Sequence, residues 1–127
     1  MAILRALRWV GRSREDLRQF PEEARRNIGY ALQFAQAGTK HPSAKPLHGF
    51  GGAAVLEIVE DHQADTYRAV YTVRFAEAVY VLHAFQKKSK SGIKTPKKEI
   101  ELIRNRLRRD EEEHRQFSHS KEVGHET

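Results

Sequence analysis

The sequence predicts an α+β domain with an N-terminal helical hairpin. We expect the hairpin to pack on a small, mainly antiparallel twisted sheet of about four strands, followed by a C-terminal helix. Apolar residues recur at helical spacing in residues 13–38 and again in residues 95–109. Between them, residues 54–86 contain three short segments of strand character, joined by connections short enough for hairpins. With 127 residues, the chain has room for one such domain.

The N-terminal part is predicted to begin with a strand at residues 3–10, although its apolar alternation is imperfect. The segment Ser13–Asp16 has the form of a capping box, in which the serine caps a short helix and Asp16 stands at its third position. Leu17 and Phe20 give this helix an apolar edge, and Pro21 interrupts it.

A second helix follows at once. Pro21 suits its first turn, and Glu22 and Glu23 lie near its positive end. Gly38 is expected just beyond its last residue, in the left-handed conformation that glycine tolerates. The apolar stripe of this helix consists of Ala24, Ile28, Ala31, Leu32 and Ala35.

A loop over residues 39–53 leads to strands predicted at residues 54–60, 66–75 and 78–86. The second of these is the clearest, because Arg68 and Arg74 belong to a polar face that alternates with an apolar one. We therefore expect a half-buried antiparallel strand. Its apolar face consists of Tyr67, Ala69, Tyr71, Val73 and Phe75.

The composition changes abruptly after the third of these strands. The segment Lys87–Lys98 holds six lysines in twelve residues and no acid. Thr95 and Pro96 are predicted to start the C-terminal helix, whose apolar stripe ends near Arg109. We expect a domain of residues 1–109 and a polar acidic tail, residues 110–127, that is frayed or disordered. The stripe consists of Ile100, Ile103 and Leu107.

The charge is distributed unevenly along the chain. Residues 110–127 hold six acidic and two basic side chains, a net charge of −4, and the whole chain carries +6, so residues 1–109 carry +10. A body this basic attracts polyanions, because counterions are released when cationic side chains bind phosphates. Nucleic acid is therefore the expected partner.

Several classes of protein are excluded by composition. The chain has no cysteine, which rules out disulfides, thiol nucleophiles and cysteine metal sites. Its seven histidines show no metal-ligand spacing on one element, and there is no phosphate-binding loop, so we expect neither metal nor cofactor. The arginines near the N-terminus make a poor signal peptide, and no segment is apolar enough to span a membrane. We expect a soluble, cytoplasmic protein with no membrane contact.

Cationic residues are left as the candidates for chemistry. Glu57 and Glu60 point to opposite faces of their strand, because their separation is odd, so a carboxylate pair is not expected. RNA can be cut without metal when its 2′-hydroxyl attacks the neighbouring phosphate, a cation neutralises the developing charge and other groups move the protons. Arg68, Lys87 and Lys88 are the candidate cations, and a perturbed lysine or a histidine such as His83 can move protons.

A wider RNA-binding surface is expected around these residues. Phe85, on one face with His83 and near the lysines, is a candidate for stacking on a base. For any single cation, a solvated surface charge remains the alternative interpretation. The residues expected to contact RNA are Lys45, His48, Arg74, Phe85, Lys90, Lys94, Lys97 and Lys98.

Two motifs are specific when they occur together: Tyr-Arg-x-x-Tyr at residues 67–71 and Leu-His-x-Phe-x-Lys-Lys at residues 82–88. With Lys45–Phe50, Val55–Ile58 and Thr95–Lys98, they resemble the phage-derived Gp49-like proteins, a branch of the RelE/HigB-like toxin superfamily. The resemblance runs from about Arg8 to Arg109. It implies a RelE-like fold and a type II toxin that cuts mRNA, commonly on the ribosome and without metal.

The resemblance also implies roles for individual residues. Arg68 matches the arginine that binds the scissile phosphate, and Lys87 and Lys88 fall where the last strand supplies catalytic or cationic residues. Lys45 falls near a loop position where one relative carries its general base. The lysine pair that RelE carries on the second strand is replaced around residues 56–58, and the C-terminal catalytic tyrosine or histidine of other members has no clear equivalent. The general base therefore stays open between His83, His48 and a lysine.

The resemblance implies a partner as well, a helix-turn-helix antitoxin with which the toxin forms a hetero-oligomer. Two functions thus remain to be separated. The leading hypothesis is an endoribonuclease toxin neutralised by this antitoxin. The alternative is a non-catalytic, phage-derived module that binds nucleic acid or protein, which steep salt-dependent binding without cleavage would favour.

Overall fold

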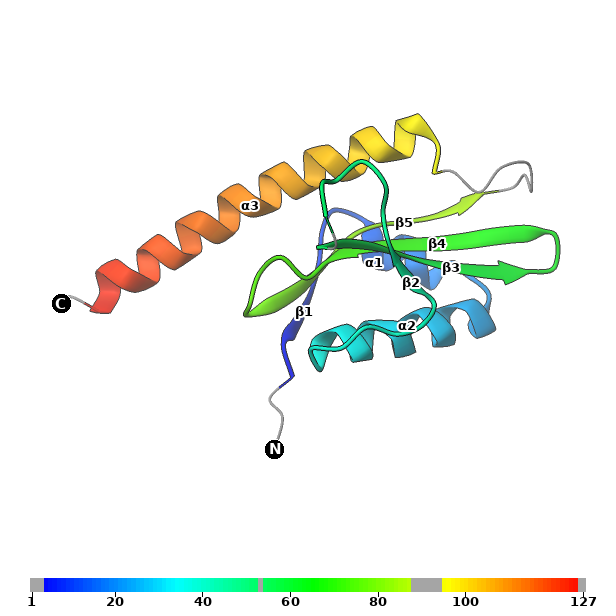
Figure 1. Cartoon of the computed structure of the whole chain (residues 1–127), viewed down its shortest axis with the longest axis horizontal. Coiled ribbons are helices and arrows are strands. Elements are labelled where there is room, and N and C mark those ends of the chain that lie inside the picture. The colour runs from blue at the N-terminus through cyan, green and yellow to red at the C-terminus, as the bar shows by residue number, and fades with distance from the viewer. Residues whose placement is uncertain (1–3, 53, 88–94, 126–127) are drawn as a thin grey trace. The chain divides into compact units, whose positions relative to one another are not determined.

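The computed structural model of the chain describes residues 4–52, 54–87 and 95–125, with side chains up to residue 116 (Figure 1). It has the predicted α+β class. The chain divides into two compact units, residues 1–94 and 95–127, which we describe separately. Over the described residues, the elements are β1 (Ala6–Trp9), α1 (Ser13–Arg18), α2 (Glu22–Gln36), β2 (Ala44–Pro46), β3 (Val55–His62), β4 (Asp65–Thr72), β5 (Ala78–Lys87) and α3 (Lys97–His125).

The first unit contains a five-stranded sheet in the order β1-β5-β4-β3-β2. The predicted meander of β3, β4 and β5 is present, and its strands are antiparallel. β1 lies at one edge, parallel to β5. β2 lies at the other edge, where the sequence analysis expected loop, and is antiparallel to β3. With three residues, one of them Pro46, β2 is too short to show an alternation, and an edge strand tolerates proline.

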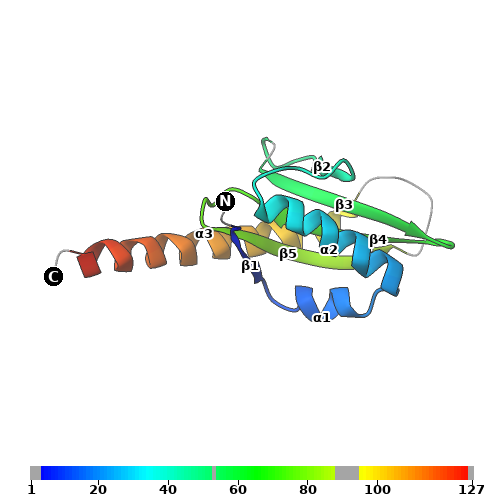
Figure 2. The same cartoon turned by 90° about the horizontal axis from the view of Figure 1, so that it is seen from below.

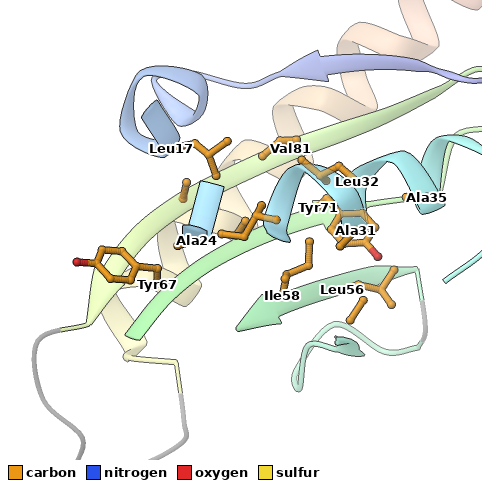
Figure 3. Close-up of a cluster of buried hydrophobic side chains, with 14 of the residues drawn as sticks. Leu17, Ala24, Ala31, Leu32, Ala35, Leu56, Ile58, Tyr67, Tyr71 and Val81 are labelled. Carbon is orange, nitrogen blue, oxygen red and sulfur yellow. The ribbon is translucent and has the colours of Figure 1, made fainter. Parts of the chain in front are cut away.

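α1 and α2 cover one face of the sheet and form the main core with it (Figure 2). The predicted stripe of α2 is buried throughout. Figure 3 shows Leu17 of α1 and Leu32 of α2 beside Val81 of β5, with Ile58 of β3 and Tyr71 of β4 in the same cluster. Side chains from alternate positions of three strands thus meet two helices.

The capping box expected at Ser13 does not form. Arg12 is the N-cap of α1 and makes no side-chain capping bond. The buried Ser13 hydroxyl instead donates to the carbonyl oxygen of Val81 at 3.1 Å, which ties the start of α1 to β5. Pro21 is likewise the N-cap of α2 and not its first helical residue. Gly38 ends that helix as predicted, with a φ of 85°.

β4 is shorter and more deeply buried than predicted. It ends at Thr72, whose hydroxyl donates to the carbonyl oxygen of Ala54 and accepts a bond from the backbone N–H of Arg74. Arg74 therefore lies beyond the strand and does not share a strand face with Arg68, as the sequence analysis expected. The expected half-buried strand is also wrong, because Arg68 and Val70, on the face opposite Tyr71, are 3% and 0% exposed.

The second unit consists of α3 and the two residues before it. Pro96 precedes the helix, and Ile103 and Leu107 of the predicted stripe are buried. The helix runs to His125, well past residue 109, where we expected regular structure to end. Opposite charges four residues apart, such as Glu111 and Arg115, are a spacing that stabilises helices without an apolar face. The domain boundary at residue 109 stays a prediction. No described helix is long and apolar enough to cross a membrane.

The core predicts a large difference between two leucines. Leu32 is 1% exposed and Leu4 is 58% exposed. Leu32→Ala should lower the free energy of unfolding by about 3 kcal/mol, because the sheet and helices cannot fully close the cavity. Leu4→Ala, the matched control, should change it by less than about 0.5 kcal/mol. Urea unfolding followed by circular dichroism measures both, and equal losses would contradict the assigned core.

Burial raises the pKa of Tyr71 from 10.0 to about 12. Because the folded protein holds this proton more tightly than the unfolded chain, the stabilisation is complete below about pH 10 and is lost as the pH rises through about 12. The free energy of unfolding should fall by roughly 2–3 kcal/mol over this window. Tyr71→Phe should remove that part of the fall, which urea unfolding of both proteins between about pH 9 and pH 12 tests.

Candidate functional site

The candidate site lies on the sheet face that points away from α1 and α2. We call it the charged face and define it by Lys45, Glu57, Arg68, His83, Phe85 and Lys87. Directly paired residues of neighbouring strands point to the same side of a sheet. The register pairs Lys45 with Glu57, Glu57 with Val70, and Val70 with His83, so one row crosses β2, β3, β4 and β5.

Two further rows complete the charged face. In the next row, Arg68 of β4 lies between Val59 of β3 and Phe85 of β5. In the row after it, Thr66 pairs with Lys87 at the end of β5. The sequence analysis placed Lys45 in a loop, but it belongs to β2 and is exposed at the edge of the sheet. Five predicted site residues therefore share one face with Glu57.

A bulge in β5 brings His83 and Phe85 to this face. Val81 pairs with Tyr71 and His83 with Val70, so Leu82 is an extra residue between two consecutive pairs. Before the bulge, Val79 and Val81 point toward the helices, and after it Ala84 does. Strict alternation from Val81 would turn His83 and Phe85 into the core. The bulge prevents this and aims both rings at the side of Arg68.

An ion pair occupies the centre of the charged face. Arg68 Nη1 lies 3.3 Å from Glu57 Oε1 and 3.4 Å from Glu57 Oε2. The two side chains are only 4% and 12% exposed. A guanidinium removed from water needs an anion within hydrogen-bonding distance, and breaking such a buried pair is costly. The pair therefore fixes the position of Arg68.

His83 and Phe85 lie against each other on β5. Their ring centroids are 5.0 Å apart and their planes meet at 20°, a stacked arrangement. They are 6% and 9% exposed. The expectation that they share a face is confirmed, but neither ring is accessible for base stacking in this structure. The stack orients the imidazole of His83 on the charged face, next to the row of Arg68.

Two further predicted RNA contacts, His48 and Arg74, lie outside the strands that form this face. His48 lies exposed in the loop after β2, and Arg74 follows the end of β4. Lys97 and Lys98 are exposed at the start of α3, in the second unit. Lys88, Lys90 and Lys94 lie outside the described residues.

Glu57 is the site residue that sequence reasoning missed. It was considered only as half of a carboxylate pair with Glu60. The structure confirms that the two point to opposite faces, because Glu60 accepts a bond from Asn27 of α2, while Glu57 contacts Arg68. The sequence did offer a signal for Glu57. This acid lies between the apolar residues Leu56 and Ile58, in the strand that precedes the one with Arg68.

The charged face carries the types of side chain that bind an anion and move protons. It carries three cations, one carboxylate and one imidazole, each on a strand of the same sheet. A guanidinium recognises a phosphate with two parallel hydrogen bonds. A carboxylate and an imidazole can accept and donate protons. Within the described ranges, no three potential metal ligands of the His, Cys, Asp or Glu type gather closely enough to hold an ion.

Comparisons with known proteins agree with this fold. The family model described as "Phage derived protein Gp49-like (DUF891)" matches residues 15–108. A mutant of the E. coli toxin RelE in the free state is similar at a TM-score of 0.53 and 18% identity, over 84% of this chain and 98% of that one. The toxin–antitoxin complex RelBE2 from Mycobacterium tuberculosis gives a TM-score of 0.42 and 18% identity, over 70% and 98%. No curated protein matches the sequence. The likeness to RelE shows a RelE-like fold.

The buried ion pair predicts strong coupling between its partners. Glu57→Leu should lower the free energy of unfolding by about 3–5 kcal/mol, because it leaves a buried guanidinium without its carboxylate. Adding Arg68→Leu should recover most of that loss, since a pair of apolar residues can replace a buried ion pair. Urea unfolding of the two single variants and the double variant gives the coupling energy. Additive losses would show that the two charges do not depend on each other.

Proposed function

This chain belongs to the phage-derived Gp49-like family, and we propose that it is the toxin of a type II toxin–antitoxin module. In this proposal it is an endoribonuclease that cuts mRNA on the ribosome without a metal ion. The observation that carries the proposal is the charged face, where Arg68, His83 and Lys87 lie on neighbouring strands of a RelE-like sheet.

Arg68 is the proposed ligand of the scissile phosphate. When the 2′-hydroxyl attacks, the phosphorane carries extra negative charge, and a guanidinium placed beside it lowers the barrier. Lys87, at the end of β5, extends the positive field, and we propose Lys88 beside it for the same role. Lys45, exposed on β2, contacts the RNA backbone farther along the same face.

His83 is the proposed general acid. An imidazole changes charge near neutral pH, so it can give a proton to the leaving 5′-oxygen and regain one from water. Its stacking on Phe85 holds the ring on the side of β4 that carries Arg68. Phosphate contact and proton donation would thus come from neighbouring strands.

RNA must gain access to this face. Arg68, His83 and Phe85 are nearly completely buried in the structure. The proposed reaction therefore requires a form of the protein in which the charged face is uncovered. This form is the one that a substrate would select, because only there can a phosphate reach the guanidinium.

A protein antitoxin is the proposed partner. A toxin that cuts mRNA harms the cell that makes it, so its activity must be held in check by a partner made alongside it. A helix-turn-helix repressor that forms a hetero-oligomer with this chain fits that need. The proposed substrate and partner place the protein in the cytoplasm.

The same burial favours a second candidate function. A face whose arginine and aromatic side chains are covered can serve the fold alone, and the exposed cations can then bind nucleic acid without cutting it. The protein would be a non-catalytic, phage-derived binding module. Its RNA binding would weaken steeply with salt, and translated mRNA would stay intact even with ribosomes present.

Induced expression should arrest growth and cut mRNA. Arg68→Ala should slow cleavage by about 10²–10³, as loss of one charge-stabilising group does, and relieve the arrest. The Lys87→Ala/Lys88→Ala double variant should also relieve it. Primer extension of cellular mRNA after induction locates the cuts, and growth curves measure the arrest.

Matched controls separate this result from a general loss of positive charge. Arg25→Ala/Arg26→Ala removes two exposed cations from α2, on the other side of the sheet, and should leave the arrest in place. Arg68→Lys keeps a positive charge but not the two-pronged hydrogen bonding, and it should also be impaired. Full toxicity of both the Arg68→Ala and the double-lysine variant would remove the proposed site.

A further inference from the structure

We propose that Tyr30, Phe34 and His41 form a second RNA-binding site, outside the charged face, on which an unpaired base of a single strand stacks. We call these three residues the aromatic cluster. It lies where α2 ends and the chain turns toward β2, within the first unit. The inference rests on RNA as the ligand in the function proposed above, but not on cleavage of that RNA.

The three rings of the aromatic cluster contact one another. The ring centroid of Phe34 lies 5.0 Å from that of Tyr30 and 4.9 Å from that of His41. The centroids of Tyr30 and His41 are 5.8 Å apart. The ring planes meet at 57°, 81° and 84°, the tilted and edge-on arrangements that aromatic pairs favour. These contacts orient the rings before a ligand binds, which lowers the entropic cost of binding.

Tyr30 is the member of the cluster that a ligand can reach. It does not belong to the core that α2 forms with the sheet. Its exposed fraction is 56%, and Leu4 is the other exposed large hydrophobic residue in the part of the chain that the structure describes. A ring that contacts two other rings and is still more than half exposed can serve as a stacking surface for a nucleobase.

Hydrogen bonds hold the loop with His41 against the end of α2. The backbone N–H and the hydroxyl of Thr39 both donate to the carbonyl oxygen of Phe34, at 2.9 and 3.0 Å. The backbone N–H of Ser43 donates to His41 Nδ1 at 3.1 Å, and that of Ala44 donates to the carbonyl oxygen of His41 at 2.9 Å. The loop is therefore ordered by its own bonds, and the cluster does not have to form around the RNA.

The charge around the cluster favours a polyanion as its ligand. Residues 24–56 contain no Asp or Glu, although the chain has 17 acidic residues. Lys40 precedes His41 and Lys45 follows it on β2, and both lysines are exposed. A surface without acids does not repel phosphates, and its lysines attract them. Aromatic rings beside cations are the combination that binds single strands with little preference for sequence.

Lys45 connects the aromatic cluster with the charged face. It belongs to that face and lies on β2, at the edge of the sheet. His41 lies four residues earlier, in the loop that leads from α2 to β2 in Figure 1. Four residues of extended chain span at most about 14 Å. An RNA strand bound at Arg68 can therefore cross the edge of the sheet at Lys45 and place a flanking base on Tyr30.

Two synthetic strands separate stacking from charge. The first is a single-stranded 2′-O-methyl RNA of about twelve nucleotides, which keeps its bases but has no free 2′-hydroxyl for cleavage. The second is an abasic strand with the same number of phosphates. Fluorescence anisotropy measures how tightly the full chain binds each of them. The parent protein should bind the strand with bases more tightly than the abasic strand at the same salt concentration.

Tyr30→Ala tests the site directly. It should weaken binding of the 2′-O-methyl RNA by about 5- to 100-fold, the loss expected for one stacked base. Binding of the abasic strand should stay within about twofold, because the phosphate contacts are retained. Tyr30→Phe keeps the flat ring and should bind both strands within about twofold of the parent protein.

Two further variants serve as controls. Leu4→Ala removes the other exposed apolar side chain and should not change the affinity for either strand. Lys40→Ala should weaken binding of both strands and reduce the slope of log affinity against log salt concentration by about one, whereas Tyr30→Ala should leave this slope unchanged. Circular dichroism and urea unfolding of each variant monitor the fold.

Three results would overturn the inference. If Tyr30→Ala binds the 2′-O-methyl RNA as the parent protein does, the cluster only holds the loop after α2. If Tyr30→Ala loses affinity for both strands equally, the ring supports the fold and does not stack on a base. If its RNA binding is unchanged but a dimer of the parent protein becomes a monomer in analytical ultracentrifugation, the cluster is an interface between two copies of the chain.

The failure of this inference can be told apart from the failure of the proposed function. If Tyr30→Ala loses binding of the strand with bases alone, but the parent protein cuts no mRNA even with ribosomes present, the stacking site stands and the endoribonuclease function fails. If the parent protein cuts mRNA and Tyr30→Ala binds RNA as tightly as the parent, the function stands and the stacking site fails.

Discussion

Removal of a guanidinium from water in the middle of a sheet is the constraint on which much of this structure depends. Arg68 lies on the central strand, and Glu57 on the neighbouring strand supplies a counter-charge. This requires one register between β3 and β4, because a shift by one residue would turn Glu57 to the helix side. The same register sends Ile58 and Tyr71 into the helix-covered core. The apolar core and the ion pair therefore select the same alignment of strands.

The sequence predicts the parts of the fold that repeat locally. The stripe of α2 and the alternation of β4 could be predicted because apolar residues recur at a fixed spacing. The spacing is three or four residues in the helix and two in the strand. β2 and the role of Ser13 were not, since a three-residue strand has no period and the serine bonds to Val81, 68 positions away. Ser13 also matched a local capping pattern, but its hydroxyl bonds to the distant carbonyl oxygen of Val81 and not to the first turn of α1.

The candidate site divides in the same way. Arg68, His83 and Lys87 lie on long strands with recognisable motifs, and the structure places the three on one face of the sheet. To identify Glu57, one has to know which side chain of β3 lies beside Arg68 on the neighbouring strand β4. A local sequence pattern does not show how two strands are aligned. The end of β4 at Thr72, which removes Arg74 from the face, is likewise set by hydrogen bonds to Ala54 and to the next turn.

The bulge at Leu82 allows β5 to change in length by one residue without turning its side chains to the other face. Because the extra residue lies between two halves of β5, its deletion would give a regular strand that still turns Val81 toward the helices and His83 away from them. A deletion farther along, at Ala84, would instead send Phe85 into the core. Relatives can thus gain or lose one residue at this point while their faces stay the same. In an alignment, a one-residue gap at Leu82 is therefore compatible with the same side chains on the same faces of β5.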